Sequence, residues 1–278
     1  MAELGSKHIV GAVNLLIRRR RHFLKNAVKL KALAELAQRE SVELVICTGD
    51  YTALGGLMEM KIARRLVEPL THAPLGFVTL PGNHDVYTLQ SVSEKRFEQF
   101  FSEFLVSDLP QYCLAGQAFP LVRLIGEHLA VIAINSAITH WQPWRSDGAV
   151  SQEQIEHLKA ILSDSAVNSR FVIFAIHYGP FRADGTPDRL DHGLRNAEAL
   201  LAVCRNVKHG AMIHGHLHHR FFLPREHAGI PIFCAGSATH EGREGCWIYD
   251  IDGVRCRAWP GYWTPEGYRL GEPLDVCD

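Results

Sequence analysis

Residues 210–220, GAMIHGHLHHR, run from a short apolar segment directly into a group of histidines. An apolar run that stops at a glycine is typical of a buried strand ending in a turn. The four imidazoles belong to His214, His216, His218 and His219, and metal binding is the chemistry that best explains so many at one strand end. A single histidine there would more often be a hydrogen-bonded core residue. The interpretation therefore depends on what else reaches the same place.

Three other apolar segments end in polar residues in the same way. SVELVICTGD ends at Asp50, LGFVTLPGNHD ends at Asn83, His84 and Asp85, and RFVIFAIHYGP continues past His177. The segments between them carry apolar residues at helical spacing. Strands that alternate with helices predict an α/β fold in which ligands bind at the carboxyl ends of the strands.

Length and composition predict one domain over residues 1–278, with the core motifs in 41–220 and further strands over about 221–260. The expected architecture is a β-sandwich of two sheets flanked by helices. Seven cysteines without a C-x-x-C pair indicate a reduced, cytoplasmic protein. The apolar run 9–17 is too short to span a bilayer and does not have the flanks of a signal peptide.

Charge limits the classes of partner. A net charge of −1 argues against nucleic acid as a partner and gives no general reason to bind an anionic membrane. The tract Arg18–Arg21 fits the solvated face of a helix, which is the favoured interpretation. A basic helix that contacts a membrane surface or an acidic partner stays the alternative.

The residue types at the strand ends suit a metal. Imidazoles, a carboxylate and an amide oxygen together suit Mn²⁺, Fe²⁺ or Zn²⁺. Asp50 has two oxygens and could bridge two cations. Asp85 follows His84 and could accept the second imidazole proton, which would fix the orientation of the ring.

The ordered motifs resemble those of the calcineurin-like metallophosphoesterase superfamily. They are Gly49-Asp50, then residues 82–85 (GNHD), then His177, then Gly215 flanked by two histidines. The resemblance implies a four-layer arrangement of the two sheets and their helices. Overall motif style is similar to the branch that contains the bacterial cyclic-nucleotide phosphodiesterases.

The resemblance also implies roles for individual residues. Asp50 would bridge two divalent ions, Asn83, His177 and His214 would complete one metal site, and His216 would belong to the other. His84 would be the catalytic histidine near the leaving group, with Asp85 in support. His218 and His219 match no motif position and are expected to be strand-end or surface residues.

The activity implied is hydrolysis of a small phosphoester, a phosphodiester or a phosphomonoester, by a metal-activated hydroxide. Manganese, iron and zinc are the expected metals. One alternative is a hydrolase of lipid-linked or nucleic-acid phosphoesters. A second alternative is a catalytically impaired or one-metal binding protein of the same fold.

One family motif is missing. The first strand of the family ends in Asp-x-His, and no such strand or motif precedes residue 41. The first metal would then keep only Asp50 and His216, so that this chain could hold one ion instead of two. We expect that Met1 lies downstream of the true start, because every other motif position is filled; a real loss of the motif is the alternative.

The loop at 177–196 is the candidate for substrate selection. It follows a predicted ligand and contains Arg182, Arg189, His192 and Arg195. A cationic loop beside a phosphate site could recognise the substrate. An ordinary exposed loop is the equally weighted alternative.

Overall fold

The computed structural model describes residues 25–142 and 144–276. The first described helix is α2 (Asn26–Arg39). The Arg18–Arg21 tract and all other residues before residue 25 lie outside the described residues. No helix in the two described ranges is long and apolar enough to cross a bilayer.

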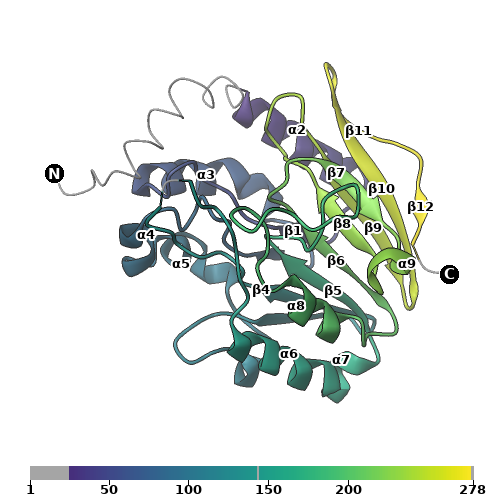
Figure 1. Cartoon of the computed structure of the whole chain (residues 1–278). Helices are drawn as coiled ribbons and strands as arrows, with labels where there is room; N and C mark the ends of the chain where they lie inside the picture. Colours follow the sequence, from purple (N-terminus) through teal and green to yellow (C-terminus); the bar gives the residue numbers. More distant parts are fainter. Residues whose placement is uncertain (1–24, 143, 277–278) are drawn as a thin grey trace.

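A six-stranded sheet forms the centre of the fold (Figure 1). Its four middle strands run parallel, and an antiparallel strand closes each edge. The strands, in spatial order, are β3 (Leu121–Ile125), β4 (Leu129–Ile134), β5 (Phe171–Ile176), β6 (Gly210–His214), β8 (Ile232–Ala235) and β7 (Arg220–Leu223). β5 is buried along its whole length, as its continuous apolar sequence predicts for a parallel strand covered on both faces.

Helices cover one face of this sheet. They are α6 (Gln152–Ser163), α7 (Ser165–Asn168), α8 (Ala197–Cys204) and α9 (Arg225–Ala228). The hydroxyl of Ser151 accepts the backbone N–H of Gln154 at 3.1 Å and so caps the N-terminus of α6. Apolar side chains of these helices pack on alternate residues of β4, β5 and β6, including Ile132, Phe174 and Met212.

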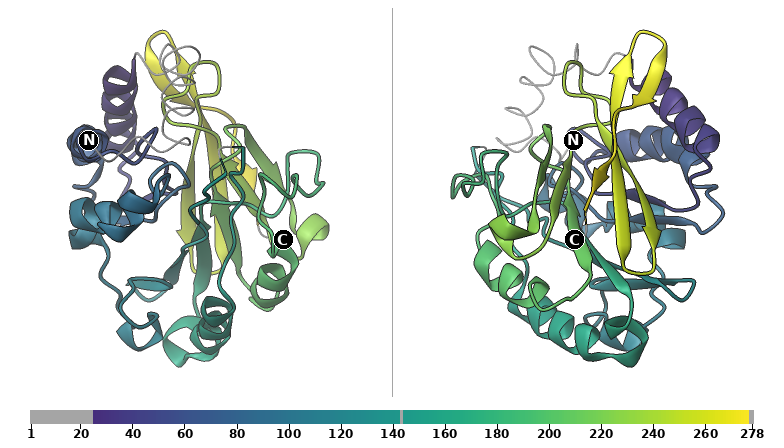
Figure 2. Two further views of the ribbon diagram at one scale, coloured as in Figure 1. Left: turned by 60° about the vertical axis from the view of Figure 1, so that its left-hand side comes forward. Right: turned by 90° about the vertical axis from the view of Figure 1, so that its right-hand side faces the viewer.

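A second layer of strands covers the other face (Figure 2). It consists of the parallel pair β1 (Val45–Cys47) and β2 (Phe77–Thr79) and an antiparallel sheet of β9 (Cys246–Asp252), β10 (Arg255–Thr264), β11 (Gly267–Leu270) and β12 (Leu274–Asp275). Val78 of β2 and Ala258 of β10 share one apolar core with Ile173 and Ile213 of the six-stranded sheet. The two sheet layers therefore form the predicted sandwich.

The outer layer on this side is helical. α2 lies along β11, and α3 (Leu57–Val67) follows the loop after β1 (Figure 1). The remaining short elements are η3 (Glu68–Leu70), α4 (Leu89–Ser93), α5 (Arg96–Phe101), η4 (Ser102–Phe104) and η5 (Pro110–Tyr112). Phe97 and Phe101 of α5 are buried core residues. The order helix, sheet, sheet, helix confirms the predicted α/β architecture.

Candidate metal centre

Four donor atoms meet where β1, β2, β5 and β6 end. Asn83 Oδ1 lies 3.0 Å from His177 Nε2 and 3.1 Å from His216 Nδ1. Asp50 Oδ1 lies 3.6 Å from His177 Nε2. We call these four residues (Asp50, Asn83, His177 and His216) the four-donor centre. Each comes from a different strand end, as expected for the carboxyl edge of an α/β sheet.

Backbone carbonyls fix which nitrogens of the two imidazoles carry hydrogen. His177 donates its Nδ1–H to the carbonyl oxygen of Thr48 at 2.7 Å, and His216 donates its Nε2–H to the carbonyl oxygen of His192 at 3.0 Å. A carbonyl can only accept, so each ring in its neutral form presents a lone pair, at His177 Nε2 and at His216 Nδ1. Burial lowers the pKa of His216 well below its ordinary value, which keeps that ring neutral.

The donor set fits a divalent cation. Two imidazole lone pairs, a carboxylate oxygen and an amide oxygen face one another, and a cation between them satisfies all four. The proton pattern of the centre is that of metal-ligating histidines, whose other ring nitrogen donates to a carbonyl.

Asp85 joins the two loops that supply Asp50 and Asn83. Its buried carboxylate accepts the backbone N–H groups of Asp50 (2.8 Å), Gly82 (2.9 Å) and Thr52 (3.1 Å). The loops approach closely because a glycine stands at each contact. A Cβ on Gly82 would lie 2.5 Å from the Asp50 nitrogen. Asp50 itself has a φ of 65°, a left-handed conformation that these hydrogen bonds hold.

The expected contact between Asp85 and the ring of His84 is replaced by another. His84 Nδ1 lies 2.7 Å from the carbonyl oxygen of Ala53, which orients the ring, while Asp85 is engaged by backbone N–H groups. The backbone N–H of His84 donates to Asp50 Oδ1 at 3.0 Å. Burial alone would raise the pKa of Asp50, but the nearby His177 and His84 rings and this N–H bring it well below its usual range. Burial and the Asp50 charge raise the pKa of Asp85.

The structure separates His214 from the four-donor centre. His214 is the last residue of β6, and its side chain points to the same sheet face as Met212, towards the helices. Its Nδ1 contacts the carbonyl oxygen of Gly215 at 3.0 Å, its ring packs on Phe221, and its buried Nε2 has no hydrogen-bond partner. His216, two residues later, meets Asn83 and His177 where His214 was expected.

His218 lies closer to the centre than the motif comparison predicted. It is half-buried, adopts a φ of 53°, and is near enough for its positive charge to lower the pKa of Asp50. His219 is exposed, as expected, and its Nε2 faces Arg243 at 2.6 Å. The signal that could have identified His218 is its spacing of two from His216, the same spacing that separates His214 from His216.

The family comparison agrees with this geometry. A model of the calcineurin-like phosphoesterase family matches residues 23–220, which is more than half of the chain and includes every residue of the four-donor centre. The chain belongs to the calcineurin-like phosphoesterase family. Membership implies metal-dependent phosphoester hydrolysis in general terms and leaves the substrate and the number of ions unspecified.

Solved structures similar to this chain include Vps29 proteins from Entamoeba histolytica. A single mutant of Vps29 has a TM-score of 0.41 at 13% identity and covers 88% of each chain, and a double mutant has a TM-score of 0.37 with the same identity and coverage. Wild-type Vps29 complexed with Zn²⁺ has a TM-score of 0.25 at 13% identity and covers 52% of this chain and 98% of its own. A search of curated proteins found no match.

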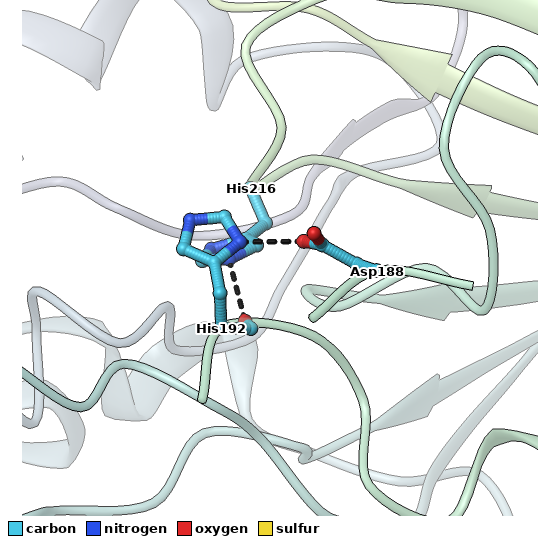
Figure 3. Close-up of side chains that lie close together, drawn as sticks. All are labelled: Asp188, His192 and His216. Carbon is cyan, nitrogen blue, oxygen red and sulfur yellow. Dashed lines mark hydrogen bonds and ion pairs between the residues drawn. The ribbon is translucent and has the colours of Figure 1, made fainter. Parts of the chain in front are cut away.

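In the loop after His177, His192 contacts the four-donor centre, whereas the arginines pair with carboxylates. Arg182 pairs with Asp184, and Arg195 pairs with the buried Asp147. Ligand atoms of Asp188, His192 and His216 lie within 4.8 Å of one another (Figure 3). Asp188 was absent from the predicted site residues, and its spacing of four from His192 is the sequence signal that pairs them.

Proposed function

We propose that this chain is a hydrolase of small phosphoesters, phosphodiesters or phosphomonoesters, that uses a divalent ion held by the four-donor centre. The observation that carries the proposal is the convergence of Asn83 Oδ1, His177 Nε2 and His216 Nδ1 within 3.1 Å contacts, with both imidazole protons directed away. Mn²⁺, Fe²⁺ or Zn²⁺ suit these donors.

A divalent ion bound there supplies Lewis-acid polarisation of a phosphoryl oxygen and lowers the pKa of bound water. The residues of the chain contribute placement and proton transfer. Asp85 holds the loops of Asp50 and Asn83 in register. His84 donates its Nδ1–H to the Ala53 carbonyl, so its Nε2 is the atom that exchanges a proton with the departing oxygen.

A second candidate function is a one-metal binding protein of the same fold. The specific observation in its favour is that Asn83 Oδ1 contacts both His177 Nε2 and His216 Nδ1. Asp50 and His218 are described side chains that could begin a second site. A second ion would need further ligands. Two ions remain the expectation from the family resemblance.

Free thiols at the six described cysteines support the proposed reducing, cytoplasmic location. The proposed partner is a small phosphoester, and the neutral net charge argues against nucleic acid. The similarity to the cyclic-nucleotide phosphodiesterase branch makes cyclic nucleotides candidate substrates to test.

The test is hydrolysis of chromogenic mono- and diesters and of cyclic nucleotides by the Mn²⁺-reconstituted chain, with bound metal counted by plasma mass spectrometry. We expect Mn²⁺-dependent turnover by the native chain and none by His177→Ala, which loses one of the donors. His227→Ala is the matched control, because its exposed imidazole contacts Gly185 and Phe181. Bound metal without hydrolysis of any ester would favour the one-metal binding protein.

A further inference from the structure

The loop 178–196 contacts His216 of the four-donor centre through Tyr178, whose ring centroid lies 4.2 Å from that of His216, and through His192. The carbonyl oxygen of His192 accepts the Nε2–H of His216 at 3.0 Å. The His192 ring also lies against the His216 ring, with centroids 4.3 Å apart and an interplanar angle of 41° (Figure 3). His192 therefore holds His216 from the side opposite to Asn83.

Asp188 in turn holds His192. Its Oδ2 accepts the Nδ1–H of His192 at 2.5 Å, and its Oδ1 accepts the backbone N–H of Arg189 at 2.8 Å. The backbone N–H groups of His192 and Gly193 both donate to the Arg189 carbonyl, at 3.0 and 2.7 Å. A Cβ on Gly193 would lie 2.7 Å from the Asp188 Cβ, so the turn closes this tightly only with glycine. Asp188 thus fixes the turn that presents the His192 carbonyl.

The rest of the loop is tied to a neighbouring loop. Gly148 donates its N–H to the Gly193 carbonyl at 3.0 Å, and Arg195 donates its N–H to the Gly148 carbonyl at 3.0 Å. The side chain of Arg195 pairs with Asp147, which is fully buried and also pairs with Arg145. The turn at 188–193 is therefore anchored by the hydrogen bonds to Gly148 and the ion pair with Asp147.

The same three side chains could be considered as a separate metal site, but their protons argue against it. Ligands that share one ion about 2.0–2.2 Å away lie roughly 3 Å or more from each other. Asp188 and His192 lie closer than that, at 2.5 Å, and their contact is a hydrogen bond. His216 carries its proton on Nε2, and its lone pair faces Asn83.

We propose that Asp188 and His192 are positioning residues for the metal ligand His216. They set the tautomer and the ring orientation that direct the Nδ1 lone pair into the four-donor centre. The inference rests on the proposed function, because it assumes that the centre binds an ion. It assigns to this loop control of metal affinity.

The test compares Mn²⁺ affinity by titration calorimetry, and the visible spectrum of bound Co²⁺, across variants of the full chain. Asp188→Ala removes the acceptor for His192 and should weaken Mn²⁺ binding about 10–100-fold and shift the Co²⁺ spectrum. Asp188→Asn keeps an acceptor oxygen and should restore most of the affinity. Asp184→Ala is the matched control on the same loop, because Asp184 pairs with Arg182 and Thr186 and should leave both readouts unchanged.

Unchanged affinity and spectrum in Asp188→Ala would overturn the inference, and so would an equal loss in Asp184→Ala, which would indicate general loosening of the loop. Loss of one of two bound ions in Asp188→Ala would make Asp188 a ligand and would equally overturn a positioning role. If the native chain binds no Mn²⁺, the proposed function fails together with the inference. That result differs from the others because it appears before any substitution is made.

Discussion

Gly82→Ala changes the contact on which the four-donor centre depends. The added methyl group would lie 2.5 Å from the backbone nitrogen of Asp50 and 2.8 Å from its Cγ. Ordinary contacts begin at 3.4 Å, so the loops of Asp50 and Asn83 would have to separate by about 1 Å. The hydrogen bonds from Asp50 N–H to Asp85 and from His84 N–H to Asp50, now 2.8 and 3.0 Å, would then exceed hydrogen-bonding distance.

The cost follows from these contacts. Two partly buried hydrogen bonds at about 1–1.5 kcal/mol each give a loss of about 2–3 kcal/mol in the free energy of unfolding. A ligand displaced by about 1 Å also misses the tolerance of roughly 0.2 Å for metal coordination. We therefore expect Mn²⁺ affinity to fall about 100-fold or more.

The assay is urea unfolding of the metal-free protein, followed by Mn²⁺ titration calorimetry. Gly56→Ala is the matched control. Gly56 has a φ of −73°, and a Cβ there would meet only the flexible end of Glu59, at 3.2 Å. A Gly82→Ala variant with native stability and native Mn²⁺ affinity would refute the close approach of the two loops.

Three further predictions concern His84, His214 and removal of the bound metal. His84→Ala should lower turnover about 10²–10⁴-fold while Mn²⁺ affinity is retained, since its backbone N–H still holds Asp50; equal loss of metal would contradict its assigned role. Burial lowers the pKa of His214 to about 4, so the unfolded chain, with a pKa near 6.5, takes up the proton first as pH falls. Acidification from pH 6.5 to 4 should therefore reduce the unfolding free energy of the metal-free protein by roughly 3 kcal/mol through this group, and His214→Gln should remove that part of the slope; parallel pH profiles would count against it. When free Mn²⁺ is held at 100 times its Kd, removing it with a chelator should lower the unfolding free energy by about 2.7 kcal/mol in urea titrations. Identical unfolding curves with and without chelator would argue against metal binding to the native state.

Much of the fold could be predicted because its signals are local. Apolar runs ending in glycine located β2, β5 and β6, and the hydroxyl of Ser151 located the start of α6. Asp50, Asn83 and His177 could be brought together because each follows the carboxyl end of a parallel strand, although β1 and β2 belong to a different sheet from β5. The strands after residue 260 were missed, because β11 and β12 carry polar residues and are stabilised by pairing with β10.

Which histidine enters the four-donor centre could not be predicted from the sequence, because it depends on backbone conformation. His214 still belongs to β6 and alternates with Ile213, whereas His216 leaves the sheet in a left-handed conformation, with a φ of 62°. The contact of His192 with His216 could not be predicted for a different reason. It lies 24 residues before His216, and only the path of the loop brings its carbonyl to that ring.

The most direct test of the account is anomalous diffraction at the manganese absorption edge from crystals of this chain grown with Mn²⁺. The account predicts a peak at coordination distance from Asp50, Asn83, His177 and His216. A bound ion placed only beside the loop 178–196, or no peak near the four donors in Mn²⁺-saturated crystals, would contradict it.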